Sequence, residues 1–436
     1  MFLVGLLSSA ASLAFGWGLK KYNEGDRQYN ITDREFQLSA VVICTVVAPL
    51  VVLIGNHLAI QSNVTYTETR SGWEQAANQD ITTCHRDGSC HWTYQCDPYT
   101  VTTTYKDSDG KIQTRTETKY HDCPYFTEEW RFVLNTTVGQ ISIADHNAPT
   151  NPTAHLWRAW VSAPSNIPSG YPATWLASKA RLDAGTPGPV AVRWNYENYI
   201  LASDNLLRKE SDRITAYKEK GLMPEFQHQI EQDYLQNRIY WVMSPAEGDW
   251  LQAINRFNAA FGDAKQGDLH LLLIDAKRVD NPDYYASAVA AYWQSPAFAK
   301  QALSKNAVVV VLGVENGKVA WARASSGMPI GNEALFLKIQ NQLPGTEVTP
   351  EKLLGVPTAT ISQSQQVTYT LPQGELGKLL WQFERVCMRC DGQDGSANPG
   401  YLYLLNQVQP DTLQQVLIGF AVVLASGAVW YVVLRN

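Results

Sequence analysis

The sequence predicts a mixed α+β multi-pass membrane protein, and three observations lead to that fold class. Apolar segments lie near both ends of the chain, two before residue 56 and one after residue 415. Six of the seven cysteines lie between them. A strand–helix–strand pattern follows residue 240, which is typical of a sheet covered by helices. We therefore expect two N-terminal transmembrane helices, a β-rich disulfide-stapled unit, an α/β (βαβ-type) sandwich and one C-terminal transmembrane helix.

Composition agrees with a membrane protein and excludes several other classes. Charged residues make up 17% of the chain, below the roughly 25% of an average soluble protein. The formal net charge is −6, so no broad basic surface exists to bind nucleic acid. An aromatic content of 11% excludes a disordered or collagen-like chain.

Three segments are long and apolar enough to predict membrane spans: Leu3–Leu19, Leu38–Gly55 and Val416–Leu434. No Lys or Arg precedes the first segment, whereas a signal peptide has a basic region before its apolar run. An uncleaved helix therefore fits better. Small residues recur along this helix, and they either let another helix approach closely or belong to a weak anchor without a specific partner: Gly5, Ser8, Ser9, Ser12 and Gly16.

The distribution of Lys and Arg predicts the orientation in the membrane. The loop Lys20–Gln37 contains four basic residues and the C-terminal tail one, whereas the other flanks of the spans contain only Arg70. Cytoplasmic loops are enriched in Lys and Arg. We therefore expect this loop and the C-terminus in the cytoplasm, and residues 62–411 on the extracytoplasmic (periplasmic or extracellular) side.

Sequence patterns divide the chain into six parts. These are two transmembrane helices with a short cytoplasmic loop (1–61), a Cys-rich β domain (62–148), a Pro-rich connector (149–196), an α/β domain (197–390), a loop-rich juxtamembrane segment (391–411) and a C-terminal transmembrane helix (412–436). Three tryptophans in the connector either form a ligand surface or pack it onto a domain: Trp157, Trp160 and Trp175.

The four cysteines of the β domain predict two disulfides, because an even number of cysteines outside the cytoplasm is typical of paired thiols. If Asp109-Gly110 is a two-residue hairpin loop, Cys96 lies opposite Cys123, and Cys84 is left to pair with Cys90. Histidines beside these cysteines allow a zinc site instead, although the short spacing of common structural zinc sites is absent.

The remaining pair, Cys387 and Cys390, has the spacing of a redox motif. It follows a predicted helix, Gly377–Arg385, rather than opening one at the end of a strand. A structural disulfide that closes a small loop is therefore favoured over a redox-active one.

The α/β domain shows the most regular pattern of the chain. Two helices are expected first, one beginning near Glu197 and one over Pro224–Arg238. The elements expected next are a helix over Pro245–Phe261, a strand over His270–Asp275, a helix over Asp283–Lys305, an apolar strand over Ala307–Val314, a turn at Asn316-Gly317, a strand over Lys318–Ala324 and a helix over Glu333–Leu343.

The strand LLLID, the helix with YA and YW, and the stretch KNAVVVVLGVENGKVAWARASSGMPIGNE resemble the TPM domain over about residues 245–345. That family includes thylakoid-lumen proteins of photosystem II repair, bacterial envelope proteins and acetylcholine-receptor modulators. The resemblance implies a βαβ-type sandwich outside the cytoplasm, tethered by a terminal membrane helix. It also implies either a phosphatase or cation-binding activity, or a role in assembly. Gly327 and Gly331 replace the family's glycine-rich turn, with Met328-Pro329 inserted.

Four polar residues near the ends of these elements are candidate ligands for Ca²⁺ or Mg²⁺, which prefer oxygen ligands: Asp275, Asp280, Asn332 and Glu333. Asp275 ends a strand, where ligands of open α/β sheets commonly bind. The alternative is that the four residues cap helices or occupy their first turns. The sequence contains no nucleotide-binding loop and no hydrolase signature, so we assign no catalytic residue.

Two functions are consistent with these observations. The first is a membrane-anchored extracytoplasmic interaction or assembly module that scaffolds an envelope complex. The alternative is a divalent-metal-dependent, phosphatase-like hydrolase that uses the TPM-like loops. Transport is disfavoured because no predicted span contains an ionisable group for an ion path. The expected partners are the lipid bilayer, other membrane or envelope proteins and a second copy of the chain, without nucleic acid.

Overall fold

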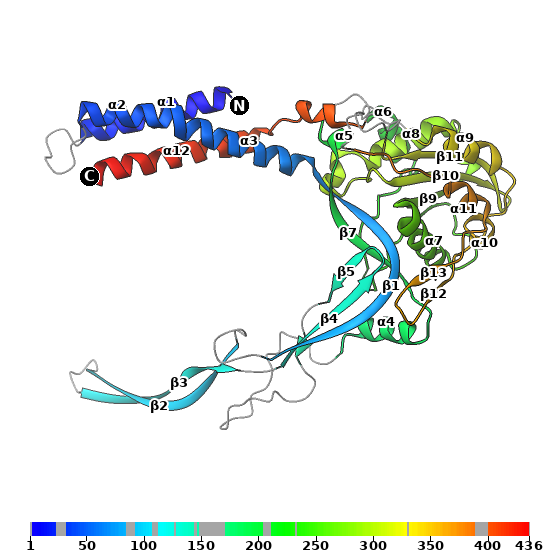
Figure 1. The fold of residues 1–436 in the computed structure, drawn as a ribbon, viewed down its shortest axis with the longest axis horizontal. Helices are drawn as coiled ribbons and strands as arrows, with labels where there is room; N and C mark the ends of the chain where they lie inside the picture. Colours follow the sequence, from blue (N-terminus) through cyan, green and yellow to red (C-terminus); the bar gives the residue numbers. More distant parts are fainter. Residues whose placement is uncertain are drawn as a thin grey trace.

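The computed structural model describes residues 2–22, 32–83, 92–106, 112–125, 128–143, 146–147, 171–203, 211–231, 233–328, 331–388 and 400–435. A group of long helices lies at one side, and a long curved strand leads from it toward an α/β sandwich (Figure 1). A separate two-stranded hairpin extends beyond the far end of that strand (Figure 1).

The long helices are α1 (Phe2–Tyr22), α2 (Asp33–Val42), α3 (Ala48–Val64) and α12 (Thr412–Arg435). A π-helical turn, η1 (Ile43–Val47), joins α2 to α3 into one continuous helix. This helix and α12 are long and apolar enough to cross a membrane, as the sequence predicted for the second and third apolar segments. The first segment forms α1, and its insertion as a third span stays a prediction.

The π-helical turn has a local cause in Pro49. Proline has no N–H to donate to the carbonyl four residues earlier, and its ring crowds that carbonyl, which belongs to Thr45. A π-helical turn is a known way to accommodate such a disruption within a helix. The Thr45 hydroxyl donates a 2.7 Å hydrogen bond to the Val41 carbonyl, which adds a local contact at this turn.

Small residues of α1 form the contact with α12. A Cβ atom added at Gly16 would lie 2.3 Å from ring atoms of Trp430, so the indole packs directly on the α1 backbone. The Trp430 indole N–H donates to the Ser12 carbonyl at 3.2 Å, and both residues are buried. One turn toward the other end, Ser8 lies against Gly419. Of the two alternatives that the sequence left open, the structure supports the close approach of another helix to this small-residue face.

The strand β1 (Thr65–Thr83) continues directly from α3 and pairs with two different strands. Its first half pairs antiparallel with β7 (Pro189–Glu197), and its second half pairs with β4 (Glu128–Thr136). Two short strands extend the sheet beside β4: β5 (Gly139–Ser142) and β6 (His146–Asn147). The end of the predicted connector, as β7, is therefore part of the sheet that begins at the membrane helix.

The connector also contains a helix that the sequence did not predict, α4 (Ala173–Asp183). Trp175 of this helix packs on Phe132, and its indole N–H donates to the Asn78 carbonyl of β1 at 3.1 Å. Trp175 thus packs the connector onto the sheet, whereas Trp157 and Trp160 lie outside the described residues.

The hairpin consists of β2 (Trp92–Lys106) and β3 (Ile112–Tyr125), as predicted, but the predicted register is wrong. Cys96 lies opposite His121 rather than Cys123. One cause is the pairing of Lys106 with Ile112, which is one residue out of step with a two-residue loop at Asp109-Gly110. The other is a register shift between Cys96 and Tyr99, next to a proline that has no N–H for the ladder.

The structure describes only some of the cysteines that the disulfide predictions involve. Cys84, Cys90 and Cys390 lie outside the described residues. Cys44, in a candidate membrane helix, is a free thiol, and a disulfide at Cys387 stays a prediction. A bond between Cys96 and Cys123 stays a prediction, without the register argument that first suggested it.

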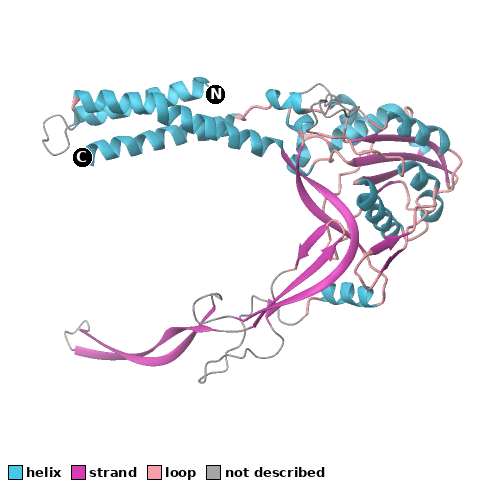
Figure 2. Ribbon diagram, in the orientation of Figure 1, coloured by secondary structure: helices cyan, strands magenta, loops and turns pink. Residues whose placement is uncertain are grey.

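The sandwich contains a four-stranded sheet in the order β11-β10-β9-β8. Its strands are β8 (Ile239–Val242), β9 (Asp268–Asp275), β10 (Ala307–Glu315) and β11 (Lys318–Ser326). The first three are parallel, and β11 is antiparallel to β10. A small hairpin of β12 (Ala359–Ile361) and β13 (Val367–Tyr369) lies nearby (Figure 2).

Helices cover both faces of this sheet, as the sequence predicted. One face packs on α7 (Trp250–Lys265), α9 (Glu333–Gln342), α10 (Pro350–Leu353) and α11 (Glu375–Leu380). The other packs on α6 (Ser211–Glu219) and α8 (Pro282–Trp293). Alternate residues of β9 point to opposite faces, with Leu271 in the first core and Leu272 in the second.

Most predicted elements of the sandwich are confirmed, including the strands β9 to β11, the helix α9 and the turn at Asn316-Gly317. Both turn residues have positive φ, 52° and 72°, which suits the hairpin turn that this dipeptide predicts. The predicted helix Asp283–Lys305 ends at Trp293, and the chain continues past a proline as a 3₁₀ helix, η4 (Pro296–Gln301).

Two predicted helices are wrong in extent or in kind. The helix expected from Glu197 is only the short α5 (Tyr199–Ala202), and α6 begins after residues that lie outside the described part. The described part of Pro224–Arg238 is irregular. Its backbone bonds to other elements instead: the Tyr234 carbonyl, from a residue with φ of 61°, accepts from the Ala191 N–H of β7 at 2.8 Å.

The contact between α1 and α12 can be tested by enlarging Gly16. We expect Gly16→Leu to destabilise the folded chain by about 1–3 kcal/mol, because any side chain there overlaps the Trp430 ring. Chemical unfolding of the detergent-solubilised chain measures the effect. Gly18→Leu is the matched control, since an added Cβ at Gly18 meets no atom within 4 Å. Equal stability of the two variants would contradict the packing.

Candidate functional site

The four predicted metal ligands lie at two opposite ends of the sheet. Asp275 ends β9 beside Val314 of β10. Because β11 is antiparallel, it ends at Ser326 beside Val308, and α9 with Asn332 and Glu333 follows from there. The rise along a strand is about 3.3 Å per residue, so these two strand ends lie about 20 Å apart. The structure brings Asn332 and Glu333 together, but not with Asp275.

Two of the four residues, Asp275 and Glu333, accept a hydrogen bond from a backbone N–H of their own loop. The Asp275 carboxylate accepts from the Lys277 N–H at 3.0 Å and caps a short 3₁₀ helix, η3 (Ala276–Arg278). Asp280 has an almost fully exposed side chain, 4.0 Å from the Lys220 ammonium.

At the opposite end of the sheet, the Asn332 amide exchanges two hydrogen bonds with the Glu384 backbone, at 2.8 and 2.9 Å. The Glu333 carboxylate accepts from the Gly331 N–H at 2.8 Å, which lowers the pKa of Glu333. Within the described residues, no group of three or more His, Cys, Asp and Glu side chains is arranged to hold a metal ion. Asp275 and Glu333 fit the capping alternative, whereas Asp280 and Asn332 make contacts of other kinds.

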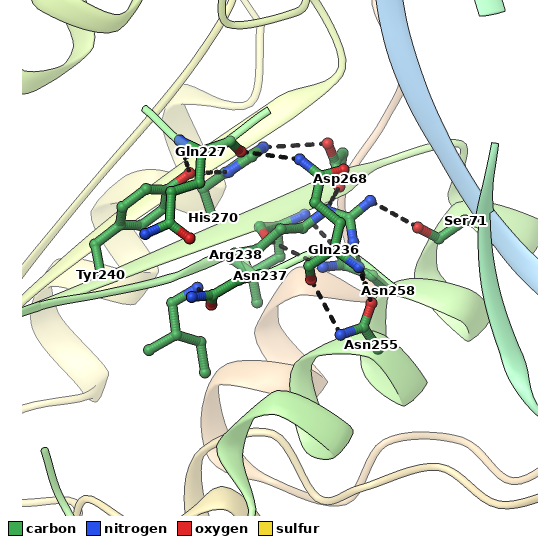
Figure 3. Close-up of polar contacts among 12 residues, drawn as sticks. Ser71, Gln227, Gln236, Asn237, Arg238, Tyr240, Asn255, Asn258, Asp268 and His270 are labelled. Atoms are coloured by element: carbon green, nitrogen blue, oxygen red, sulfur yellow. Dashed lines mark hydrogen bonds and ion pairs between the residues drawn. The ribbon is translucent and has the colours of Figure 1, made fainter. Parts of the chain in front are cut away.

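A buried polar network lies at the amino end of the parallel strands, where β1 crosses the sandwich (Figure 3). Its centre is an ion pair between Arg238 and Asp268, with Nε and Oδ1 2.6 Å apart. The Arg238 side chain is fully buried. Its other nitrogens donate to Ser71 Oγ of β1 at 2.9 Å and to Asn255 Oδ1 of α7 at 3.4 Å. One guanidinium group therefore connects β1, α7 and β9.

His270 extends the network along β9. Its Nε2 lies 3.1 Å from Asp268 Oδ2, and its Nδ1 lies 3.0 Å from the Tyr240 hydroxyl. A carboxylate only accepts hydrogen bonds, so we place the proton of a neutral imidazole on Nε2, and Nδ1 accepts from Tyr240. Burial raises the pKa of the Tyr240 hydroxyl, which keeps it protonated as a donor.

The charge state of Asp268 follows from its neighbours. Burial alone raises the pKa of this carboxyl, but the charge of Arg238 and the hydrogen bonds from His270 and Arg238 outweigh burial and hold it below its usual value. Asp268 is therefore ionised at neutral pH and compensates the charge of Arg238.

Two asparagines of α7 complete the network. The Asn258 side chain exchanges two hydrogen bonds with the Leu269 backbone, at 2.7 and 3.0 Å. The Asn255 side chain accepts from the Gln236 N–H at 3.1 Å and donates to its carbonyl at 3.0 Å. These bonds satisfy backbone groups that flank β8 and β9 and fix α7 against both strands.

A small cavity lies over the network and is lined by Glu68 of β1, His270 and Ser304, among others. It leaves about 20 Å³ for a water-sized sphere, room for about one water, whereas ligand pockets have about 300–1,000 Å³. Ser304 Oγ and Gln236 Oε1 are buried without a hydrogen-bond partner among the described residues, so a water in this cavity would have polar atoms to bond.

The geometry also argues against a serine nucleophile in this cavity. A Ser–His–Asp triad requires one imidazole nitrogen to accept the serine proton. In His270, both ring nitrogens are already bonded, to Asp268 and to Tyr240. The network thus holds elements together rather than presenting a reactive group.

Two further buried carboxylates fix β1 on either side of Ser71. Glu74 accepts from Ser178 at 2.6 Å and is paired with Arg181, both on α4. Glu68 is paired with Arg70 at 2.7 Å and accepts from the Asn306 amide at 3.1 Å. Three consecutive contact points along one strand therefore bond it to α4, to the sandwich and to the ion-pair network.

The membrane end of β1 is fixed by Lys300 of η4. Its ammonium donates to the Ser62 and Asn63 carbonyls at the end of α3, at 2.7 and 2.8 Å. Cations stabilise helix C-termini, where carbonyls lack partners. The Asn63 and Gln414 side-chain amides exchange two hydrogen bonds, at 2.9 and 3.0 Å, which joins α3 to the start of α12.

Sequence reasoning did not identify Arg238, Asp268, His270 or Tyr240 as a group. A signal was present in β9, where Asp268 and His270 stand two residues apart in an otherwise apolar strand and so point to one face. The pairing with Arg238 had no sequence signal, because a helix was predicted there.

Comparison with known proteins adds no assignment, since no protein-family model, curated protein or solved structure matches this chain.

Removing one partner tests the buried ion pair. We expect Arg238→Met to lower the free energy of unfolding by about 3–5 kcal/mol, because Asp268 is left as a buried charge. Lys179→Met is the control, since Lys179 and Asp183 form an exposed pair that contributes about 0.5 kcal/mol. Urea unfolding of the solubilised chain compares the two. Similar losses would show that the ion pair does not hold the elements together.

The pH dependence of stability tests the ionisation of Asp268. The pKa of Asp268 in the folded chain lies below its unfolded value of about 3.9. The stability that the ionised carboxylate contributes is therefore fully present above about pH 3.9, and it is lost as the pH falls through the folded pKa. We expect Asp268→Asn to flatten the decline of unfolding free energy below about pH 4. Asp183→Asn is the control, because Asp183 is an exposed aspartate that pairs with Lys179 on the surface of α4. The same decline in Asp268→Asn and wild type would contradict this assignment.

Proposed function

We propose that the chain is a membrane-anchored extracytoplasmic scaffold for an assembly in the cell envelope. The observation behind this proposal is the direct continuation of the candidate membrane helix α3 into β1. β1 is bonded along its length to β7, β4, α4 and the sandwich. The position of the sandwich is thereby fixed relative to the end of a membrane helix, which is the property a scaffold needs.

The use of buried charge supports the same proposal. Four charged side chains are buried, and each has an ion-pair or hydrogen-bond partner on another element of the chain: Arg238, Asp268, Glu68 and Glu74. Structural ion-pair networks also contain buried charges with shifted pKa values, so buried charge alone does not mark a catalytic site. Here the charges connect elements across long separations in sequence.

Orientation and the number of spans remain part of the proposal. We place the loop between α1 and α2 and the C-terminus in the cytoplasm, on the distribution of Lys and Arg. The packing of α1 on α12 supports α1 as a third span. A disulfide from Cys387 to Cys390 and one from Cys84 to Cys90 are consistent with an extracytoplasmic sandwich and sheet.

A TPM-like identity of the sandwich is likewise proposed, on the strand–helix–strand order and the four-stranded sheet. The metal-dependent hydrolase that this resemblance also implies has less support. Asp275 and Glu333 lie at opposite sheet ends, and each carboxylate accepts a backbone N–H of its own loop.

Site-specific photo-crosslinking in the cells that make the chain tests the scaffold. We expect a crosslinker at Tyr105 or Ile112, both exposed on the β2–β3 hairpin, to form defined adducts with an envelope protein or a second copy. Leu337, exposed on α9, is the matched control position. The adducts identify the assembled component.

The same preparation separates the scaffold from the hydrolase. The scaffold predicts that Asp275→Ala and Glu333→Ala leave the adducts unchanged. Calorimetric titration of the solubilised chain with Ca²⁺, Mg²⁺ and Zn²⁺, with a phosphoester assay, provides the opposite test. Micromolar metal binding and hydrolysis, both lost in these two variants and without adducts from the hairpin, would replace the scaffold by the hydrolase.

A further inference from the structure

The β2–β3 hairpin is exposed on both faces. Its described side chains are all exposed or half-buried, and Ile112 and Tyr120 are 71% and 50% exposed. Within the described residues its sheet has two strands only. A lone two-stranded hairpin is marginally stable in water, and an unpaired strand edge is a template for another strand.

The two edges of this hairpin differ. The edge of β2 is interrupted by Pro98, which cannot donate to a ladder, and by the register shift beside it. Both are devices that protect an edge from pairing. The edge of β3 has neither feature from Ile112 to Asp122. The strand that can accept a partner is therefore β3.

The two faces of the hairpin also differ. One face consists of directly opposed threonine pairs, which stabilise antiparallel sheets: Thr100 with Thr118, Thr102 with Thr116, and Thr104 with Thr114. The other face of β3 has alternating charges, Arg115, Glu117 and Lys119. Arg115 and Glu117 form a 2.8 Å ion pair with 69% and 43% of their side chains exposed, so both can contact a second strand.

We propose that β3 pairs with β3 of a second copy of this chain, antiparallel and about a two-fold axis at Thr116. This register sets Glu117 opposite the partner's Arg115, and Arg115 opposite the partner's Glu117. It also sets the exposed Tyr120 opposite the partner's Ile112. Opposite charges and apolar pairs that face one another across strands are each favourable. A two-fold interface makes every such pair occur twice.

Other arrangements oppose like charges or lose these pairs. In a parallel pairing, Arg115 and Glu117 would each face the same residue of the partner. An antiparallel register centred on Glu117 sets it against itself and Arg115 against the partner's Lys119. A register centred on Thr118 keeps one charge pair, with Lys119, but sets Arg115 against the partner's His121. Like charges directly opposed destabilise a sheet.

The pairing converts two marginal hairpins into one four-stranded sheet, above the number of strands at which sheets become stable on their own. Its threonine face is then continuous across both copies. This inference deepens the proposed function, and rests on it, by naming a second copy as the partner of the scaffold's hairpin.

Charge reversal of the full chain in detergent, in a Cys44→Ala background, tests the interface. We expect wild type to be dimeric at micromolar concentration by light scattering. Glu117→Arg and Arg115→Glu should each weaken the dimer tenfold or more, because each sets like charges opposite one another twice. An equimolar mixture of the two variants should form a heterodimer, since all four charges are then complementary across the interface.

Neither single variant can form the Arg115–Glu117 ion pair within its own chain. A heterodimer in the mixture therefore reports charge pairing between chains and not the pair within one chain. A monomeric mixture, or single variants that dimerise as wild type does, would overturn the proposal.

Cysteine substitution tests the register itself. In the proposed pairing Thr116 lies opposite its own copy, at the Cα separation of about 4.5–5.5 Å that a disulfide can bridge. We expect Thr116→Cys to form a covalent dimer on mild oxidation. Thr114→Cys and Thr118→Cys should not do so alone but should cross-link when mixed. Efficient cross-linking of Thr118→Cys with itself would overturn the register.

The outcomes keep this inference distinct from the scaffold. A monomeric wild type whose hairpin still forms adducts with another envelope protein would overturn self-pairing and leave the scaffold intact. A dimer with β3 cross-links, combined with metal-dependent hydrolysis lost in Asp275→Ala, would support self-pairing and replace the scaffold.

Discussion

The ion pair between Arg238 and Asp268 is the contact on which the arrangement of the rest depends. The guanidinium group precedes β8, its carboxylate partner opens β9, and its remaining donors contact Ser71 of β1 and Asn255 of α7. Breaking such a buried pair leaves an uncompensated charge, so the elements are held in one arrangement. Apolar packing alone would allow β1 to slide along the sandwich. The directional hydrogen bonds at Ser71, Glu68 and Glu74 prevent this sliding.

This arrangement explains how a chain with few charges orders a long strand that continues from a candidate membrane helix. Lys300 holds the junction between α3 and β1. Farther along β1, its own buried carboxylates Glu68 and Glu74 bond to other elements. Each contact fixes a different point of the strand, and together they specify its register against the sandwich. Cysteines add to such a framework only locally. The buried polar groups therefore supply the specificity between parts that hydrophobic cores supply within each part.

The sequence predicts the interior of the sandwich well and its connections poorly. Short continuous apolar runs, and the Asn316-Gly317 turn, depend on neighbouring residues only, and these elements were confirmed. The segment before Arg238 has helical spacing, yet its backbone bonds go to β7, a contact that no local pattern shows. The hairpin register failed for a similar reason, because Pro98 shifts a ladder that the turn sequence alone would set.

The same distinction separates the buried network from the hairpin. In the network, every charge has found a partner within the chain, so little free energy remains for binding another molecule. In the hairpin, the threonine pairs satisfy one another, but the β3 edge and the alternating charges of Arg115 and Glu117 face outward. Ordering a two-stranded ribbon costs conformational entropy that its own contacts barely offset. A strand that is regular, uninterrupted and self-complementary in charge is therefore best explained by an additional strand that completes it.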